Sequence, residues 1–322
     1  MLDSFNRNID YARISVTDRC NLRCTYCMPN GDEYYNTCEE IMSDEDILKI
    51  CKSFSKIGIK KIKITGGEPL LRKKIISLIE KIKCIPGIDE VTLTTNGILL
   101  DQYLEELKKI DIDGINISID AVDEMLFENI TGFNKVKDVI NVINKGEKLG
   151  IKNIKLNCVL IKNTNEDQYT KLVNLIKDKH ICIKFIEMMP IGIGKEYNPI
   201  TLNEVKKILE NEFGELIIEN EKLGNGPAEY YKINGLKCRI GFIGAISHKF
   251  CKTCNRIRVT SDGFLKTCLH FNTGINLKQY INKNNLEEII EATILKKQES
   301  HKFEEKSDSC NFEVKYMAQI GG

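Results

Sequence analysis

The sequence predicts an α/β protein built on a parallel sheet that curls into a full or partial barrel. Short β-branched runs alternate with amphipathic helical stretches from residue 11 to about residue 190. They form six strand–helix units, and strands that are joined by helices run parallel. The chain of 322 residues is long enough for one large domain with a smaller appendage.

The expected strands are short and rich in isoleucine, valine and threonine. They cover residues 11–16, 60–65, 91–95, 114–120, 153–159 and 181–187. The first helix between them is expected to begin at Ser43, where Asp46 three residues on supplies a capping box, and to end at Gly58.

Polar and apolar residues alternate within these strands, which is unusual for a parallel sheet buried on both faces. In the second strand Lys61, Lys63 and Thr65 alternate with Ile62 and Ile64, and other strands follow the same pattern. An antiparallel sheet with one wet face would also alternate, but the helical connections count against it. The pattern therefore favours an apolar face under the helices and a polar, cationic lumen for an anionic ligand.

The pattern changes after about residue 195. A helix is expected at 201–213, short strands at 228–232, 237–243 and 255–266 with a turn at 261–263, and a helix at 275–296. The charged stretch 297–309 is expected to be mobile. These features predict a domain at 1–195, a smaller α+β domain at 196–310 and a C-terminal tail at 311–322.

Charge and composition narrow the class of protein. A net charge of +1 gives no reason to expect nucleic acid or a membrane as partner. The sequence shows neither a membrane-spanning apolar run nor the apolar segment of a signal peptide, so a cytoplasmic location is expected. Of the thirteen cysteines, six form two tight groups and the other seven are scattered through mostly apolar segments.

Each cysteine group offers three thiols, and three is one fewer than a closed tetrahedral zinc site needs. The first group is Cys20, Cys24 and Cys27; the second is Cys251, Cys254 and Cys268. Three thiolates on a cubane iron–sulfur cluster leave one iron open to a ligand. For the second group a zinc site completed by the flanking His248 or His270 remains an alternative. A cluster that only transfers electrons would be expected to have four cysteines per site.

The first group resembles the signature of radical S-adenosylmethionine enzymes. It has the spacing C-x3-C-x2-C with an aromatic residue, Tyr26, before the last cysteine, and a Gly-Gly-Glu-Pro turn follows the second expected strand. The order of later motifs resembles the GTP 3',8-cyclase family of that superfamily. These motifs are LTTNG, INISIDA, IKFIEMMPIG, FCKTCNRIRVTSDG, LKTCL and the final Gly-Gly.

The resemblance implies a partial (β/α)6 barrel of the radical SAM type and a C-terminal α+β domain carrying a second iron–sulfur cluster. It implies two [4Fe-4S] clusters and S-adenosyl-L-methionine as cofactors, with Tyr26, Gly67, Ser118 and Met189 at the S-adenosylmethionine site. The implied reaction is that of a lyase that converts GTP to (8S)-3',8-cyclo-7,8-dihydroguanosine 5'-triphosphate through a 5'-deoxyadenosyl radical. This is an early step of molybdenum cofactor biosynthesis.

The resemblance also implies a GTP site and a functional C-terminus. Its GTP positions, with Lys61 added, are Arg13, Lys61, Lys63, Thr94, Lys155, Arg256 and Arg258. Lys63 stands where the family commonly has arginine, which keeps the charge but loses the guanidinium fork. Gly321 and Gly322 match a terminal pair that reaches the active site, as a tail without side chains can.

The expected partners are GTP, a reducing electron donor and cyclic pyranopterin monophosphate synthase as recipient of the product, with a homodimer as a further expectation. An alternative reading is another two-cluster radical enzyme, such as a peptide maturase. That reading leaves the lumen cations and the terminal glycines without a role.

Overall fold

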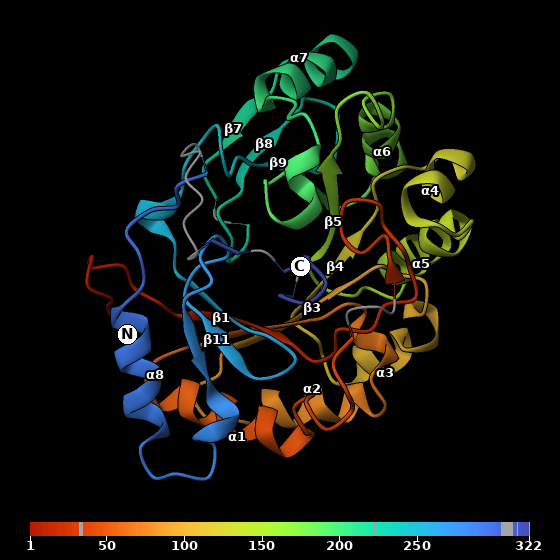
Figure 1. The fold of residues 1–322 in the computed structure, drawn as a ribbon. Coiled ribbons are helices and arrows are strands. Elements are labelled where there is room, and N and C mark those ends of the chain that lie inside the picture. The colour runs from red at the N-terminus through yellow and green to blue at the C-terminus, as the bar shows by residue number, and fades with distance from the viewer. Residues whose placement is uncertain (32–34, 222, 304–311, 314, 322) are drawn as a thin grey trace. The chain divides into compact units, whose positions relative to one another are not determined.

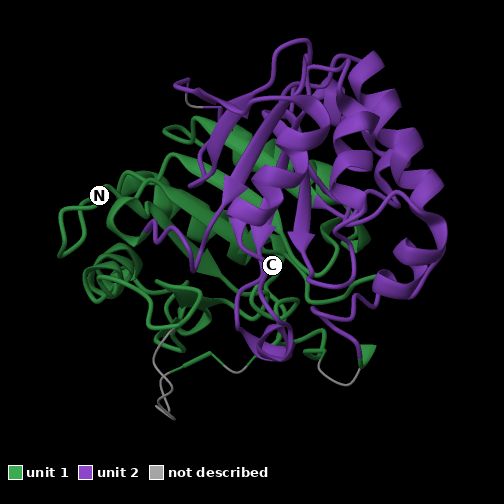
Figure 2. Ribbon diagram, turned by 90° about the horizontal axis from the view of Figure 1, so that it is seen from above, with its two compact units in different colours: residues 1–21, 30–94, 251–322 green, residues 22–29, 95–250 purple. Residues whose placement is uncertain are grey.

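The computed structural model describes residues 1–322 except 32–34, 222, 304–311, 314 and 322. The chain divides into two compact units, coloured separately in Figure 2. The first unit comprises Met1–Asn21, Asn30–Thr94 and Cys251–Gly322, and the second comprises Leu22–Pro29 and Thr95–Phe250. Each unit is built on a largely parallel sheet, so the predicted α/β class is confirmed.

The sheet of the first unit has the strand order β12-β11-β10-β1-β2-β3. Strands β10, β1, β2 and β3 are parallel, whereas β11 and β12 are antiparallel additions at one edge. The bounds are β1 (Tyr11–Ser15), β2 (Lys61–Thr65), β3 (Glu90–Thr95), β10 (Arg256–Val259), β11 (Phe264–Lys266) and β12 (Gly274–Asn276).

The sheet of the second unit repeats this plan in the order β4-β5-β6-β9-β8-β7. Strands β4, β5, β6 and β9 are parallel, and β8 and β7 follow antiparallel. The bounds are β4 (Gly114–Ser118), β5 (Ile154–Leu160), β6 (Cys182–Glu187), β7 (Ile217–Glu219), β8 (Glu229–Lys232) and β9 (Arg239–Ile243). In both units, therefore, strands from the predicted C-terminal domain extend a parallel sheet.

Helices connect the parallel strands and cover their apolar faces, and Figure 1 shows α8, α1 and α2 beside β1 and β11. Helix α1 begins after Ser43 with the predicted capping box to Asp46, and Gly58 follows its end with φ +88°. The helices are α1 (Asp44–Lys56), α2 (Ile75–Lys83), α3 (Leu104–Lys109), α4 (Glu124–Thr131), α5 (Val136–Lys148), α6 (Gln168–Ile176), α7 (Leu202–Phe213) and α8 (Leu286–Leu295).

The alternation that predicted a polar face is present in the structure. In β2, Ile62 and Ile64 are at most 1% exposed, whereas Lys61 and Lys63 are half-buried on the opposite side. In β5 the burial alternates residue by residue along the whole strand. Because side chains of a strand point alternately to its two faces, each unit has one apolar face and one face lined by polar and cationic groups.

One expectation for the C-terminal region is wrong, and a second is wrong for the part of its stretch that the structure describes. Residues 275–296 were expected to form one helix, but Ile275 pairs with Leu265 in the sheet, Leu277–Gln279 form a short 3-10 helix, and α8 begins only at Leu286. Asparagines at 276, 282, 284 and 285 are poor helix formers and explain the late start. The stretch 297–309 was expected to be mobile, yet Lys297 and His301 are buried at its beginning. Residues 304–309 lie outside the described residues.

In the part of the chain that the structure describes, no helix is both long and apolar enough to span a bilayer. The predicted division at residues 195 and 310 remains a prediction.

Candidate functional site

The polar face of the first unit carries a row of cations across neighbouring strands. The strand register places Arg258 opposite Arg13, and Arg13 opposite Lys63. One row away, Arg256 lies opposite Tyr11, which lies opposite Lys61. Strands that are about 4.8 Å apart bring such side chains close together. Four of the cations predicted for GTP are therefore adjacent, and Lys61 is beside them.

The electrostatics of this row favour an anion. Burial lowers the pKa of the Arg13 guanidinium, and nearby Arg256 lowers it further. Burial, Arg13 and Arg256 hold the pKa of Arg258 well below its ordinary value. Like charges that are withdrawn from water repel one another, so a bound polyanion would offset the repulsion between these arginines. Lys61 forms an ion pair of 2.9 Å with Asp10.

Thr94, the remaining GTP candidate of this unit, is half-buried in β3. It lies two residues after Thr92, the register partner of Lys63, and so on the same face. Thr94 therefore places a hydroxyl group on the same face of the sheet as Lys63.

The C-terminal tail reaches this same face. Arg258 donates a hydrogen bond to the carbonyl oxygen of Gly321. A side chain on Gly321 would meet the Cβ of Ser15 at 3.1 Å and the Cγ2 of Thr65 at 3.3 Å, and its φ of +74° also favours glycine. Gly322 lies outside the described residues.

The tail is anchored upstream by a buried ion pair. Lys266 of β11 and Glu313 bind each other with their side chains 1% exposed, and Lys266 also donates to the carbonyl of Phe271 at 2.7 Å. Removing one partner of such a pair leaves an uncompensated buried charge. The pair therefore holds the segment that leads to Gly321.

The β10–β11 hairpin explains the spacing of the second cysteine group. Arg258 pairs with Lys266 in an antiparallel ladder, so residues shortly before β10 lie beside residues shortly after β11. Cys254 precedes β10 by two residues and Cys268 follows β11 by two residues. Both cysteines therefore lie at the open end of the β10–β11 hairpin. Cys251 begins a 3-10 turn in which the N–H of Cys254 donates to its carbonyl at 3.2 Å.

The three thiols of this group suit a metal cluster. They interact electrostatically, since Cys254 and Cys268 both act on the pKa of Cys251, which burial raises. Burial also raises the pKa of Cys254, but Lys297 and Arg256 outweigh it and bring the value to about 7. A lowered pKa favours the thiolate that binds metal.

The zinc alternative is not favoured by the geometry. His270 is one of the two histidines that could complete a zinc site. The ring of His270 packs instead among Phe271, Phe303 and Phe312 at centroid distances of 4.4 to 4.6 Å. The second group is therefore a candidate for a cluster with three thiolate ligands.

The Gly-Gly-Glu-Pro turn lies against the backbone that leads into Cys20. The N–H groups of Gly67 and Glu68 donate to the carbonyls of Thr17 and Arg19 at 2.8 and 2.7 Å. A Cβ on Gly67 would lie 2.3 Å from the Arg19 oxygen, so only glycine fits. Cys20 and Gly67 thus share the carboxyl-terminal end of β1 and β2, where α/β folds place their chemistry.

The second unit carries Cys24, Tyr26 and Cys27 on one short loop. The N–H of Cys27 donates to the carbonyl of Cys24 at 2.9 Å, which forms a tight turn. Tyr26 donates its hydroxyl hydrogen to Asp120 at 2.6 Å. Burial raises the pKa of Asp120 to about 6, and burial together with Asp120 raises the pKa of Tyr26. Sequence analysis did not assign Asp120 to the site, although it lies two residues after Ser118 in a quoted motif.

The polar face of the second unit holds other predicted contacts. Ser118 ends β4 opposite Asn157 in β5, and Asn157 lies opposite Lys184 in β6. Oδ1 of Asn157 is buried without a hydrogen-bond partner among the described residues, as expected where a ligand supplies the donor. Lys155 lies on the same face and donates to the carbonyl of Leu223. Met189, two residues beyond β6, is half-buried.

Lys184 was missed by sequence analysis. It is 9% exposed and donates to Oδ1 of Asn116 at 2.5 Å. Gly241 of β9 makes room for it, because a Cβ there would meet the Cγ of Lys184 at 3.1 Å. A lone lysine between Ile183 and Phe185 is the signal that could have found it.

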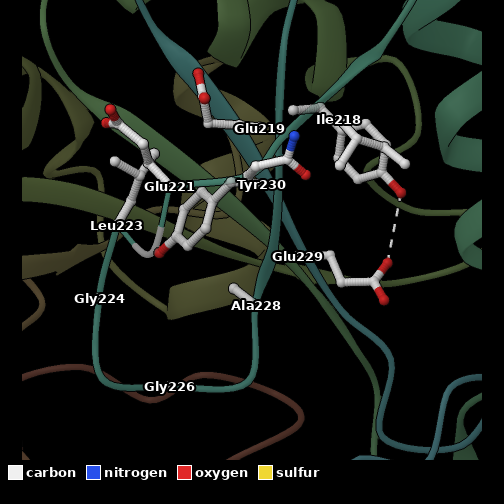
Figure 3. Close-up of a pocket in the computed structure, with 11 residues that line it drawn as sticks. Ile218, Glu219, Glu221, Leu223, Gly224, Gly226, Ala228, Glu229 and Tyr230 are labelled. Carbon is white, nitrogen blue, oxygen red and sulfur yellow. Dashed lines mark hydrogen bonds between the residues drawn. The ribbon is translucent and has the colours of Figure 1, made fainter.

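A pocket of about 320 Å³ lies at the β7–β8 hairpin of the second unit (Figure 3). Its lining includes Glu219, Glu221 and Glu229, with Tyr230 at the centre of the view. Three carboxylates disfavour an anionic ligand. This pocket is therefore not the candidate site, although its loop touches Lys155 through Leu223.

Comparison with known families agrees with these arrangements. Residues 14–176 match the Radical SAM superfamily model, and residues 181–303 match the model described as Molybdenum Cofactor Synthesis C. The first match spans half of the chain. The protein is a member of the radical SAM superfamily.

Full-length relatives narrow this assignment. The GTP 3',8-cyclases of Clostridium acetobutylicum, Clostridium perfringens (strain 13) and Petrotoga mobilis are 44%, 42% and 39% identical, each with 100% of both chains covered. The chain belongs to the GTP 3',8-cyclase family. Membership confirms the predicted cofactors, iron–sulfur clusters and S-adenosylmethionine.

A solved structure supports the fold class. Streptococcus suis SuiB bound to S-adenosylmethionine has a TM-score of 0.66 over 94% of this chain and 75% of that chain. The two sequences are only 17% identical, so this likeness concerns the fold alone.

Proposed function

We propose that the protein converts GTP to (8S)-3',8-cyclo-7,8-dihydroguanosine 5'-triphosphate in molybdenum cofactor biosynthesis. The observation that carries the proposal is the row formed by Arg258, Arg13 and Lys63. The row lies on the face of the sheet that Gly321 covers. Its Arg258 belongs to the β10–β11 hairpin, which the second cysteine group flanks. The names and full-length coverage of the relatives support the same reaction.

In this proposal the cationic face binds the triphosphate. Arginine holds two phosphate oxygens at once, whereas Lys63 acts as a point charge. Lys61 would bind a phosphate oxygen directly only if its ion pair with Asp10 breaks; otherwise it would add positive charge to the face without contact. The residues assigned to GTP are Arg13, Lys61, Lys63, Thr94, Lys155, Arg256 and Arg258.

The second cysteine group would hold a cluster whose open iron receives the guanine. Its ligands would be Cys251, Cys254 and Cys268, which lie near the amino-terminal end of β10. Because Arg256 lies between these ligands and Arg258 along β10, the same strand would orient both the base and the phosphates.

The other cluster would be held by Cys20, Cys24 and Cys27, with S-adenosylmethionine beside Tyr26, Gly67, Ser118 and Met189. When bound and supplied with one electron by a reductant, this pair would supply the 5'-deoxyadenosyl radical that takes hydrogen from ribose C3'. Gly67 would present its backbone to the cofactor, and the N–H groups of Gly67 and Glu68 hold this turn against the carbonyls of Thr17 and Arg19. The Oδ1 of Asn157, next to Ser118, has no hydrogen-bond partner among the described residues and is a further polar group for this cofactor.

Gly321 and Gly322 would act at the substrate. Gly321 lies against Ser15 and Thr65, and Arg258 fixes its carbonyl. A terminal pair without side chains can occupy this position beside a nucleotide without excluding it.

The test is GTP-dependent cleavage of S-adenosylmethionine. Anaerobically reconstituted protein, given reductant, S-adenosylmethionine and GTP, should release 5'-deoxyadenosine and form the cyclised nucleotide, and CTP should not replace GTP. Deleting Gly321 and Gly322 should abolish cyclisation while both clusters assemble. Release that is indifferent to the nucleotide would contradict the choice of substrate.

Further parts of the proposal concern the setting of the enzyme. We propose a cytoplasmic location, an electron donor, a homodimer, cyclic pyranopterin monophosphate synthase as recipient of the product, and domain boundaries near residues 195 and 310. No observation favours the alternative of a peptide maturase, because a peptide would leave the cationic row unexplained.

A further inference from the structure

A buried lysine lies next to the second cysteine group without belonging to any predicted site. Lys297 follows α8 and is 3% exposed, whereas its neighbour Lys296 is exposed. Lysine is rarely buried unless it is paired, because taking an ammonium group out of water is costly. The position of Lys297 therefore calls for an explanation.

The contacts of Lys297 join two cysteine-bearing segments. Its Nζ donates to the carbonyl of Arg256 at 3.0 Å and to the carbonyl of Thr267. Arg256 lies two residues after Cys254, and Thr267 directly precedes Cys268. One ammonium group thus ties together the backbone beside two of the three thiols.

The segment that begins with Lys297 also reaches the third thiol. Arg7 donates to the carbonyls of Gln298 and Glu299 at 2.7 and 2.8 Å, and to the carbonyl of Cys251 at 3.0 Å. The backbone N–H of His301 points to Sγ of Cys251 at 3.5 Å.

Arg7 is itself buried and held by Asp3 at 2.6 Å. Residues 297–301 and Arg7 therefore form a brace, which we call the 297–301 brace, that touches the backbone around all three cysteines.

We propose that Lys297 is a positioning residue for the second cluster, and that its buried positive charge raises the reduction potential of that cluster. The inference rests on the proposed function, because it assumes that Cys251, Cys254 and Cys268 hold a cluster.

Two physical effects support the proposal. Groups just outside the ligands orient them, and changes to such groups commonly weaken metal affinity roughly 10- to 100-fold. Reduction adds negative charge to a cluster, and a nearby cation in a poorly solvated site stabilises that charge. Loss of Lys297 should therefore loosen the cluster and make it harder to reduce.

The experiment isolates the second cluster within the full chain. A background carrying Cys20→Ser, Cys24→Ser and Cys27→Ser should retain only that cluster after anaerobic reconstitution. In this background K297M removes charge and donors, K297Q keeps donors but removes charge, and K296M is the exposed control. The measurements are iron and sulfide per chain, the rate of iron loss to a chelator, and the midpoint potential by electron paramagnetic resonance.

We expect K297M to lose iron to the chelator roughly tenfold faster or more, in line with the effect of changing outer-shell groups. K297Q should retain more iron than K297M but show a more negative potential, and K296M should match the background. If K297M does not fold, the potential of K297Q decides. A potential of K297Q equal to that of K296M would overturn the charge effect, and equal iron loss in K297M would overturn the positioning role. A background without any cluster would overturn the proposed function itself.

Discussion

The pair formed by Tyr26 and Asp120 leads to a pH-dependent prediction. Asp120 is 5% exposed and accepts hydrogen bonds from the Tyr26 hydroxyl at 2.6 Å and from the Val159 N–H at 2.7 Å. Burial nonetheless raises its pKa from 3.8 to about 6. The native state therefore keeps a proton on Asp120 between these pH values, where the unfolded chain has lost it.

The sign and size of the effect follow from this difference. Stability falls with rising pH wherever the native state binds more protons than the unfolded state. Each pH unit between the two pKa values corresponds to about 1.36 kcal/mol, so ionised Asp120 costs the fold about 3 kcal/mol above pH 6. Between pH 4 and 7, the free energy of unfolding of the native protein should therefore fall by about 2 to 3 kcal/mol relative to Asp120→Asn.

Chemical denaturation of the two proteins across this pH range, with matched cluster content, measures the difference. The constant loss of one hydrogen bond in Asp120→Asn cancels, because only the change with pH is compared. Glu128→Gln, which alters an exposed carboxyl of the same unit, should show no comparable trend. A difference between native protein and Asp120→Asn that stays level from pH 4 to 7 would refute the argument.

Two further substitutions test the packing. Gly67→Ala should destabilise the protein by about 1–3 kcal/mol and impair cluster assembly at Cys20, because its Cβ would lie 2.3 Å from the Arg19 oxygen. Gly226→Ala, with nothing within 4 Å of its Cβ, is the control for thermal unfolding, and equal effects would contradict the steric explanation. Phe185→Ala should cost about 3–5 kcal/mol in denaturant titrations, because Phe185 packs on Tyr169 and Phe242. Phe133→Ala, at a residue 43% exposed, should cost far less, and a similar loss would refute the core assignment.

Local sequence patterns predicted the elements well where a single physical signal controls them. The capping box at Ser43 fixed the start of α1, and Thr201 did the same for α7. Alternation in Lys61–Thr65 predicted both the strand and its two faces. These features depend on residues a few positions apart, so they are visible without knowledge of the fold.

The expectations failed where distant partners decide the structure. Ile275 joins a strand because Leu265 pairs with it, and no local pattern shows that. Lys297 looks like part of a solvated charged run, yet two backbone carbonyls from residues 256 and 267 draw it inside. Asp120 was visible in a motif, but its bond to Tyr26 joins residues 94 positions apart.

The first unit shows how one sheet can order two separate chemical groups. Cys20 and Gly67 follow the carboxyl ends of β1 and β2, whereas Cys254 precedes the amino end of β10, which runs parallel to β1. The two groups therefore lie at opposite ends of the parallel strands, and the five residues of β1 between these ends span roughly 16 Å at about 3.3 Å per residue. The cations Arg13 and Arg258 lie opposite each other between these strand ends. Since paired strands hold their side chains in fixed positions, a ligand bound by Arg258, Arg13 and Lys63 would keep one orientation relative to the cysteines at both strand ends.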